Sequence, residues 1–276
     1  MMQEDTGVSI ENTTIGFIEP NKGFQIIEEP KNKIDPKYLR KKVFIGVPTT
    51  VSRGICPELM GFLVAYKKKF DDTNDPLEGV IAINYKNHQS VNNNLLADQF
   101  LKSDCTHYLK IDSDIVPYNG LVERMLELDK KAIACTVAIY RDTIDGIMVC
   151  MYRGEKGAYE MIDFVKEPIG ICDFAGGGVM CIAREVLQAL RQPFWKVEYN
   201  ETNGDIELAS DERFSQMVRK AGFEFWYDGT EILGQHHDII IGGQFDGLCD
   251  RRQNLILKFE KTGNGTIKYS KEGKEA

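Results

Sequence analysis

Short apolar runs alternate with amphipathic segments along the first half of the chain. Residues 43–48, 79–85 and 107–111 are apolar runs of strand length, whereas 56–70 and 91–102 repeat apolar residues at helical spacing. Strands separated by helices of this length are joined by right-handed crossovers in a mostly parallel sheet. The pattern therefore predicts an α/β fold in which two strand–helix units precede the strand at 107–111.

The second half of the chain has shorter and less regular apolar runs. After a helix predicted at 118–129, turn residues and glycines separate segments that alternate like strands. The expected strands are 132–139, 146–152, 159–165, 171–183 and 223–227, with the fourth interrupted by the glycines at 176–178, and the expected helices are 184–191 and 211–221. We expect this half to form a smaller, mixed continuation of the sheet.

The two ends of the chain differ in pattern from its centre. Residues 1–40 are predicted to be an irregular N-terminal extension, residues 41–245 a single domain, and residues 246–276 a basic C-terminal extension. In the last segment, residues 251–276 hold seven basic and three acidic side chains, which suit either a solvated tail or contact with a polyanion. A chain of 276 residues can bury a self-sufficient core.

Composition argues against several classes of protein. A net charge of −8 disfavours nonspecific nucleic-acid binding, and the 42% hydrophobic content is ordinary for a globular chain. No apolar run approaches the roughly 20 residues of a membrane span, and the polar N-terminus does not resemble a signal peptide, so we expect a cytoplasmic protein with no membrane span. The seven cysteines are odd in number and form no C-x-x-C motif, which indicates neither a disulfide framework nor a zinc site.

Polar residues follow each of the three predicted strands of the first half. The residues concerned are Pro48, Thr49, Thr50, Asn84, Tyr85, Asp112, Ser113 and Asp114. Ligands bind at the carboxyl ends of strands in parallel sheets, so the three loops are expected to converge on one site. Arg53, in the first of these loops, is either a phosphate contact or a surface charge.

The aspartates Asp112 and Asp114 carry the strongest chemical signal. Aspartates two apart in an extended segment point the same way, so both can offer oxygen to one hard cation. Mn²⁺ or Mg²⁺ held there would neutralise the phosphates of a nucleotide diphosphate and stabilise it as a leaving group. The structural alternative is an acidic turn after a strand.

Residues 93–101 (NNLLADQFL) and 107–114 (HYLKIDSD) resemble glycosyltransferase family 2, in which an Ala-Arg-Asn helix start precedes the strand that bears Asp-x-Asp. Alignment places Asn94 at the family asparagine and Asn93 where arginine is usual. The resemblance implies the GT-A fold, a Rossmann-like nucleotide-diphospho-sugar transferase fold. It also implies nucleotide contacts at Asn93, Asn94, Asp112 and Ser113. The structural alternative is that both asparagines cap the helix.

Residues 210–223 (SDERFSQMVRKAGF) are a second match to this family, whose pattern is Glu-Asp-x-x-Phe, a basic helix and Ala-Gly-(Phe/Tyr). The resemblance places Asp211 at the general base of inverting members, with Glu212 as its neighbour in reserve. Serine followed by two acidic residues is also a standard helix N-terminus. The local sequence is therefore compatible with catalysis and with helix capping.

A third match is Gly234-Gln235-His236-His237, where the family carries a Gly-His that supplies a metal or diphosphate ligand. Here Gln235 separates the glycine from the histidines, so the sequence does not choose between His236 and His237 as the ligand. Imidazole is an acceptable ligand for manganese.

The glycines Gly176, Gly177 and Gly178 resemble the family's acceptor-side loop, where a glycine lets the backbone approach the donor sugar or the acceptor closely. The alternatives are a plain bulge and a phosphate cradle, although the Gly-Lys-Ser/Thr of a P-loop is missing. Trp195 suits either stacking on an acceptor sugar or burial in a core.

The order and spacing of these motifs imply a metal-dependent glycosyltransferase of the hexosyl- or pentosyltransferase class. It would move a sugar from a nucleotide diphosphate sugar, with a uridine diphosphate (UDP) sugar as the expected donor, to a hydroxyl acceptor with inversion. Nothing selects among a glycan, a protein, a lipid-linked sugar and a modified DNA base as the acceptor.

Two other functions are compatible with the same aspartates. Residues 112–116 also resemble the D-x-D-x-(T/V) of haloacid-dehalogenase phosphatases, with Asp112 as nucleophile, but there the motif follows the first strand of the core. The third possibility is a catalytically inactive module that binds sugar or nucleotide. The presence of metal, base and histidine positions together disfavours such a module.

Overall fold

The computed structural model describes most of the chain between residues 41 and 236 and several segments outside it. The described residues are 15–19, 23–27, 41–50, 54–85, 88–140, 147–155, 158–164, 166–202, 204–236, 240–241, 247–250, 255–261 and 267–272. Side chains are described from 41 to 138 and from 150 to 235, apart from the gaps in those ranges. Of the helices in the described segments, none has the length and apolarity that a membrane span requires.

The first half of the fold consists of three strands with a helix after each of the first two. These elements are β3 (Lys42–Pro48), α1 (Pro57–Asp71), β4 (Glu78–Asn84), α2 (Gln89–Lys102) and β5 (His107–Ile111). Strands β4 and β5 lie on either side of β3 and run parallel to it. The predicted strand–helix alternation of this half is therefore confirmed.

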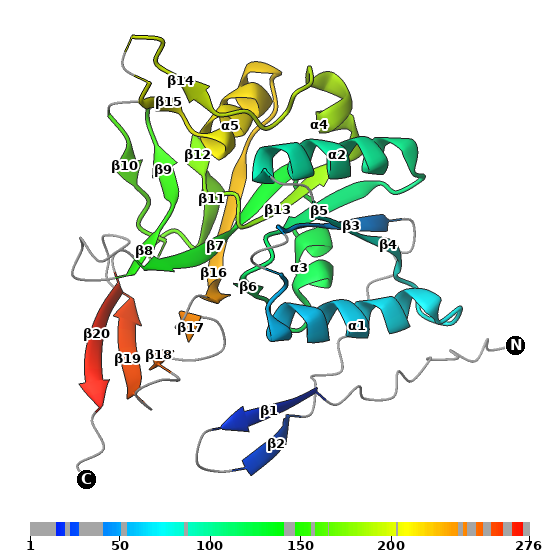
Figure 1. The fold of residues 1–276 in the computed structure, drawn as a ribbon, viewed down its shortest axis with the longest axis vertical. Helices are drawn as coiled ribbons and strands as arrows, with labels where there is room; N and C mark the ends of the chain where they lie inside the picture. Colours follow the sequence, from blue (N-terminus) through cyan, green and yellow to red (C-terminus); the bar gives the residue numbers. More distant parts are fainter. Residues whose placement is uncertain are drawn as a thin grey trace, which may run out of the picture.

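Helices cover both faces of this sheet (Figure 1). Phe100 of α2 belongs to one hydrophobic cluster with Phe44 of β3, whereas Leu59 of α1 belongs to a second cluster with Ile45 of β3. Successive side chains of a strand point to opposite faces, so neighbouring residues of β3 contribute to different clusters. The long apolar run of β3 reflects this burial on both sides.

The central sheet continues into the second half of the chain. The further elements are β6 (Ile115–Val116), α3 (Leu121–Glu127), β7 (Ala132–Tyr140), β13 (Val179–Ala183), α4 (Arg184–Ala189), α5 (Ser210–Lys220) and β16 (Trp226–His236). The strand order is β16-β7-β13-β5-β3-β4, and β13 alone in this series runs antiparallel to its neighbours. The predicted α/β fold with a mostly parallel sheet is confirmed.

Two strands predicted in the second half, 146–152 and 171–183, are divided into shorter ones, and the strand predicted at 159–165 is reduced to two residues. The structure has β8 (Ile147–Val149), β9 (Met151–Arg153), β10 (Glu160–Met161), β11 (Ile169–Ile171), β12 (Phe174–Ala175), β14 (Glu198–Tyr199) and β15 (Ile206–Leu208). The interruption predicted at the three glycines of 171–183 is present, since β12 ends before them and β13 begins after them. A further break separates β11 from β12, because each strand has its own partner: β11 pairs with β16, β12 with β9, and β13 with β5 and β7. The alternation of apolar residues in the sequence does not show which strand each segment pairs with. The antiparallel pair β14–β15 was not predicted.

Strands are also present near both ends of the chain. They are β1 (Ile15–Glu19), β2 (Gly23–Ile27), β17 (Ile240–Ile241), β18 (Gly247–Asp250), β19 (Leu255–Lys261) and β20 (Ile267–Glu272). Strands β1 and β2 form an antiparallel pair within the segment predicted to be irregular. Strands β17 to β20 continue from β16 and return to β8 (Figure 1). The domain boundaries themselves stay predictions.

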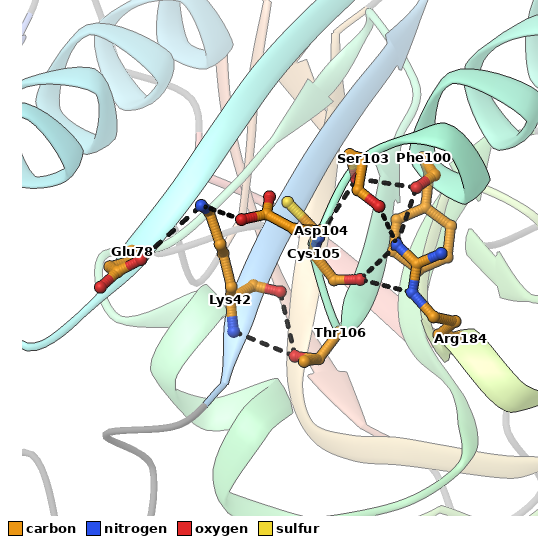
Figure 2. Close-up of polar contacts among 8 residues, drawn as sticks. All are labelled: Lys42, Glu78, Phe100, Ser103, Asp104, Cys105, Thr106 and Arg184. Atoms are coloured by element: carbon orange, nitrogen blue, oxygen red, sulfur yellow. Dashed lines mark hydrogen bonds and ion pairs between the residues drawn. The ribbon is translucent and has the colours of Figure 1, made fainter.

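An arginine closes the C-terminal end of α2 (Figure 2). The guanidinium of Arg184 donates to the carbonyl oxygens of Phe100 at 2.9 Å, Ser103 at 2.8 Å and Cys105 at 2.6 Å. It also donates to Leu101 O at 3.0 Å and lies 4.6 Å from the centre of the Phe100 ring. The last carbonyls of a helix have no partner within the helix, so a cation placed there stabilises them. Arg184 thus ties the start of α4 to the end of α2.

Replacing Arg184 with methionine is expected to lower the free energy of unfolding by roughly 3 kcal/mol, because hydrogen bonds from a charged donor are lost at several carbonyls. Urea unfolding followed by circular dichroism measures this change. Arg191→Met is the matched control, since Arg191 is exposed, and a change below about 0.5 kcal/mol is expected there. Equal unfolding midpoints for the two variants would show that the Arg184 bonds contribute nothing.

Candidate functional site

A cavity of about 530 Å³ lies at the carboxyl ends of β3 and β5. Parallel α/β sheets bind ligands at this end of their strands. Of the three loops predicted to converge, those after β3 and β5 line the cavity, whereas Asn84 and Tyr85 at the end of β4 do not. One group of lining residues follows β3 or belongs to the start of α2: Pro48, Thr49, Thr50, Gln89 and Asn92. A second group comes from the loop after β5, the glycine loop and α5: Asp112, Ser113, Asp114, Gly176, Gly177, Gly178 and Asp211.

A tight turn between β5 and β6 presents the two aspartates. The backbone N–H of Asp112 donates to Gly178 O at 2.8 Å, and the N–H of Ile115 donates back to Asp112 O at 3.1 Å. The carbonyl of Ser113 accepts from the N–H of Cys56, just before α1, at 2.9 Å. The turn is therefore held by the glycine loop on one side and by the start of α1 on the other.

Lys110 is a buried cation directly behind Asp112. Its side chain has 0% exposure, and its Nζ lies 2.6 Å from Asp112 Oδ1. It also donates to the carbonyl oxygen of Gly177. Burial raises the pKa of Asp112 to about 6; the Lys110 ammonium opposes the rise, and the charges of Asp211 and Asp114 add to it. The sequence analysis missed Lys110, although a single lysine in an apolar strand, two residues before an aspartate, places both side chains on one face.

Asp211 lies in the first turn of α5 and faces the glycine loop. Its Oδ2 accepts from the backbone N–H of Gly177 at 3.1 Å. The residue before the helix is Ala209, and no side chain caps this end, so the capping expected of Ser210 is not found. The Asp211 carboxylate therefore serves a separate segment of the chain and lines the cavity.

Gly177 owes its identity to this contact. A Cβ built on Gly177 would lie 2.3 to 2.6 Å from the carboxylate atoms of Asp211. In the structure the Asp211 carboxylate lies in the space that a side chain at this position would take. The predicted close approach of the donor sugar or the acceptor to this loop stays a prediction. Gly178, whose Cβ would lie 2.9 Å from Val137, is closely packed as well.

Glu212, the neighbouring acid, has a different environment. It is 9% exposed and accepts a hydrogen bond from the hydroxyl of Tyr159 at 2.9 Å. It is not among the residues that line the cavity. Of the two acids suggested for catalysis, the structure brings only Asp211 to the aspartates.

The asparagine of α2 that lines the cavity is Asn92, whereas the predicted nucleotide contacts were Asn93 and Asn94. Asn92 lines the cavity and donates to Thr49 O at 2.6 Å. Asn93 is 1% exposed, and neither it nor Asn94 lines the cavity. The helix begins at Gln89 with His88 as its cap, so the two predicted asparagines are not caps either.

Asn94 is committed to the loop that carries Trp195. Its Nδ2 donates to Ser90 O and to Trp195 O at 2.7 Å, and its Oδ1 accepts from Phe194 N at 2.7 Å and Trp195 N at 3.1 Å. With both oxygen and nitrogen engaged in this way, Asn94 has a structural role. The predicted nucleotide contact of Asn94 is therefore corrected.

Trp195 is not available to an acceptor. It is 1% exposed and stacks on Phe214 with ring centroids 4.5 Å apart and an angle of 9° between the planes. The indole faces are covered by the core, which corrects the predicted sugar platform. The aromatic side chain that does line the cavity is Phe174, which stacks on Tyr152 at 5.5 Å. No local pattern distinguished Phe174 from other apolar strand residues.

Gln235 stands beside Asp114 at the position that follows Gly234. Strand β16 pairs with β6 so that Gln235 is opposite Ile115, and its Nε2 donates to Asp114 Oδ2 at 3.1 Å. Its Oε1 is buried and has no hydrogen-bond partner within the described part of the chain. His236 ends β16, but its side chain lies outside the described part, as do His237 and Arg53. Their predicted roles stay predictions.

The donor atoms near Asp114 suit a hard divalent cation. The carboxylate oxygens of Asp112 and Asp114 and the buried Oε1 of Gln235 are all oxygen ligands of the kind that Mg²⁺ and Mn²⁺ accept. Among the described residues, no cluster of three or more histidine, cysteine, aspartate or glutamate side chains forms a metal site. Asp112, Asp114 and Gln235 would supply part of the oxygen shell of such a cation, and substrate oxygens and water would have to supply the rest.

The cavity is acidic. Its described lining residues include Asp112, Asp114 and Asp211 but no lysine, arginine or histidine. The nearest positive charge described here, on Lys110, is buried behind Asp112 and is already bonded.

No protein-family model matches the chain, and no curated protein matches it either. Among solved structures the chain is similar to A197 from STIV, with a TM-score of 0.47 and 20% identity over 73% of this chain and 90% of that one. It is also similar to UDP-glucose pyrophosphorylase complexed with UDP-glucose, with a TM-score of 0.40 and 9% identity over 76% of this chain and 92% of that one. Likeness at this level assigns no activity to the chain.

Proposed function

We propose that the chain is a metal-dependent glycosyltransferase of the GT-A type. It moves a sugar from a nucleotide diphosphate sugar, with a UDP sugar as the expected donor, to a hydroxyl group with inversion. The observation that carries the proposal is the acidic cavity, where Asp112, Asp114 and Asp211 meet without a basic lining residue in the described part of the chain. A diphosphate needs a divalent cation to bind beside three carboxylates.

Asp114 and Gln235 are the residues that we expect to hold the cation. They are already hydrogen-bonded to each other at 3.1 Å, and the buried Oε1 of Gln235 lacks a partner among the described residues. Asp112 lies beside them with its Oδ1 held by Lys110. Mn²⁺ or Mg²⁺, when bound, would neutralise the diphosphate and stabilise it as a leaving group.

The opposite group of lining residues is proposed to bind the nucleoside. Pro48 ends β3, Thr49 and Thr50 follow it, and Gln89 and Asn92 belong to the start of α2. Asn92 holds the carbonyl of Thr49 at 2.6 Å, so the loop and the helix keep one relative position. Such preorganisation reduces the entropy that a bound nucleotide must lose.

Asp211 is proposed as the general base. As the acceptor oxygen attacks the anomeric carbon, the bond from that carbon to the diphosphate oxygen breaks and the diphosphate leaves with the electron pair. Asp211 takes the proton from the attacking hydroxyl. The Gly177 N–H, 3.1 Å from Asp211 Oδ2, keeps the carboxylate turned toward the cavity. A single displacement of this kind inverts the configuration of the sugar.

Thermal unfolding across a panel of nucleotide sugars, with and without MnCl₂, tests donor binding. At about 100 times the dissociation constant a ligand stabilises by about 2.7 kcal/mol, which is a shift of roughly 5 °C or more for a chain of this size. We expect such a shift for one nucleotide class, only with the metal. Asp114→Asn should reduce the shift to below about 1 °C, because it removes a charged ligand of the cation.

Two controls make this result decisive. Asp98→Asn removes a carboxylate from the outer part of α2, where it bonds to Lys102, and should leave the metal-dependent shift unchanged. Sugar transfer to water or to a glycan panel then separates an enzyme from an inactive binding module. If no nucleotide sugar gives a metal-dependent shift in the unfolding temperature, the proposed function is wrong. If the protein hydrolyses phosphate esters through an aspartyl-phosphate at Asp112, it is a phosphatase.

A further inference from the structure

Lys110 is a charged residue in the middle of the central sheet. It lies on β5 between Gly46 of β3 and Met180 of β13, and its side chain is fully buried. Burying an ammonium group costs several kcal/mol unless it is paired and hydrogen-bonded. An apolar residue would fill this place in an ordinary strand core, so the lysine requires a specific explanation.

The ammonium of Lys110 joins two segments that both line the cavity. It is 2.6 Å from Asp112 Oδ1, in the turn after β5, and it donates to the carbonyl oxygen of Gly177, in the loop before β13. The next carbonyl, of Gly178, accepts from the backbone N–H of Asp112 at 2.8 Å. The turn and the glycine loop are thus bonded through a side chain and through the backbone.

The amide of Gly177, which belongs to the preceding peptide group, is bonded to Asp211. The N–H of Gly177 donates to Asp211 Oδ2 at 3.1 Å. One residue, Gly177, therefore accepts from Lys110 through its carbonyl and donates to Asp211 through its amide. The sequence of contacts runs from Asp112 through Lys110 and Gly177 to Asp211.

We propose that Lys110 is a positioning residue that sets the separation of Asp112 and Asp211 by holding the Gly177 backbone between them. The inference rests on the proposed function, in which Asp112 lies on the donor side and Asp211 takes the acceptor proton. Lys110 is fully buried and does not line the cavity. It acts through the two aspartates.

The chemistry of lysine suits this place better than that of other polar residues. An ammonium group is compact and has three donors in a tetrahedral arrangement, so it can serve a carboxylate and a carbonyl that lie in different directions. The planar fork of arginine is larger and presents its donors in one plane. Glutamine could reach the carbonyl but would not balance the charge of Asp112.

A double-mutant cycle between Lys110→Met and Asp211→Asn tests the inference. At saturating donor and metal, Lys110→Met alone is expected to lower kcat about 30- to 100-fold, because a displaced base loses its alignment with the acceptor. In the Asp211→Asn background the same change should lower the residual rate less than threefold. Residues that act as one unit show such non-additivity.

The controls separate positioning from stability. Circular dichroism and the unfolding midpoint establish that each variant is folded, and Lys110→Gln serves as a second variant that keeps a donor toward Gly177. Lys131→Met, at an exposed lysine paired with Glu185, should leave kcat unchanged. Equal losses from Lys110→Met in both backgrounds, or an unchanged kcat in the folded single variants, would overturn the inference.

The wild-type protein, assayed in parallel, distinguishes this failure from a failure of the proposed function. If the wild-type protein transfers no sugar from any donor, the proposed function is wrong and the role of Lys110 in it is no longer at issue. If it transfers sugar and the Asp211→Asn variant is impaired, only the role of Lys110 is in question.

Discussion

Asp211→Asn is expected to lower the rate of sugar transfer by about 10² to 10⁴ while changing the dissociation constant of the metal–nucleotide sugar complex by less than threefold. General-base catalysis is worth about this much, and an amide cannot accept the proton. The substitution keeps an oxygen that can accept from the Gly177 N–H, so the loop should stay in place. Single-turnover transfer with radiolabelled donor measures the rate, and calorimetry measures the binding.

Glu212→Gln is the matched control for this prediction. Glu212 is the next residue on the same helix, is bonded to Tyr159 and does not line the cavity. We expect its transfer rate to stay within about fivefold of wild type. If Glu212→Gln abolished transfer and Asp211→Asn did not, the assignment of the base would be reversed.

The first half of the fold could be predicted because each of its elements has its own local pattern. The apolar run at 43–48 and the helical spacing at 56–70 are complete within a few residues, so no distant contact is needed to recognise them. The same holds for the position of Asp112 and Asp114 at the end of a buried strand. Local patterns also placed Asp211 in the first turn of a helix.

The rest of the site depends on contacts between segments that are far apart in the sequence. Gln235 reaches Asp114 only because β16 pairs with β6. Asn94 donates to the carbonyl of Trp195 and accepts from its backbone N–H, so the two residues bind each other and neither lines the cavity. No spacing along the chain encodes these pairings. The family pattern has a histidine after the glycine, so it predicts a ligand at His236 or His237 and none at Gln235.

The role of the buried Lys110 could be predicted from the sequence only in part. Its position two residues before Asp112 in a strand placed the two side chains on one face, and this much was visible in the sequence. The hydrogen bond from Lys110 to Gly177 could not be predicted from the sequence, because it requires β13 to lie beside β5. The residues that orient a site are thus harder to predict than those that face the ligand, since they have no chemistry of their own to identify them.

Gly177→Ala is expected to lower kcat about 100-fold while leaving the unfolding midpoint close to that of wild type. The new methyl group would lie 2.3 to 2.6 Å from the carboxylate of Asp211, so one of the two must move. The carboxylate is at the end of a side chain and moves at little cost to stability. A displacement of about 1 Å from the productive geometry can cost about 10² in rate.

Gly61→Ala is the control that makes the same chemical change where nothing is displaced. Gly61 lies within α1, and a Cβ there meets no atom within 4 Å. Alanine in a helix interior is favoured over glycine by about 0.5–1 kcal/mol, so this variant should be more stable than wild type and fully active. A Gly177→Ala protein that retained wild-type kcat would mean that the base tolerates displacement, or that Asp211 is not the base. The Asp211→Asn result decides between these two, because only in the second case does that variant stay active.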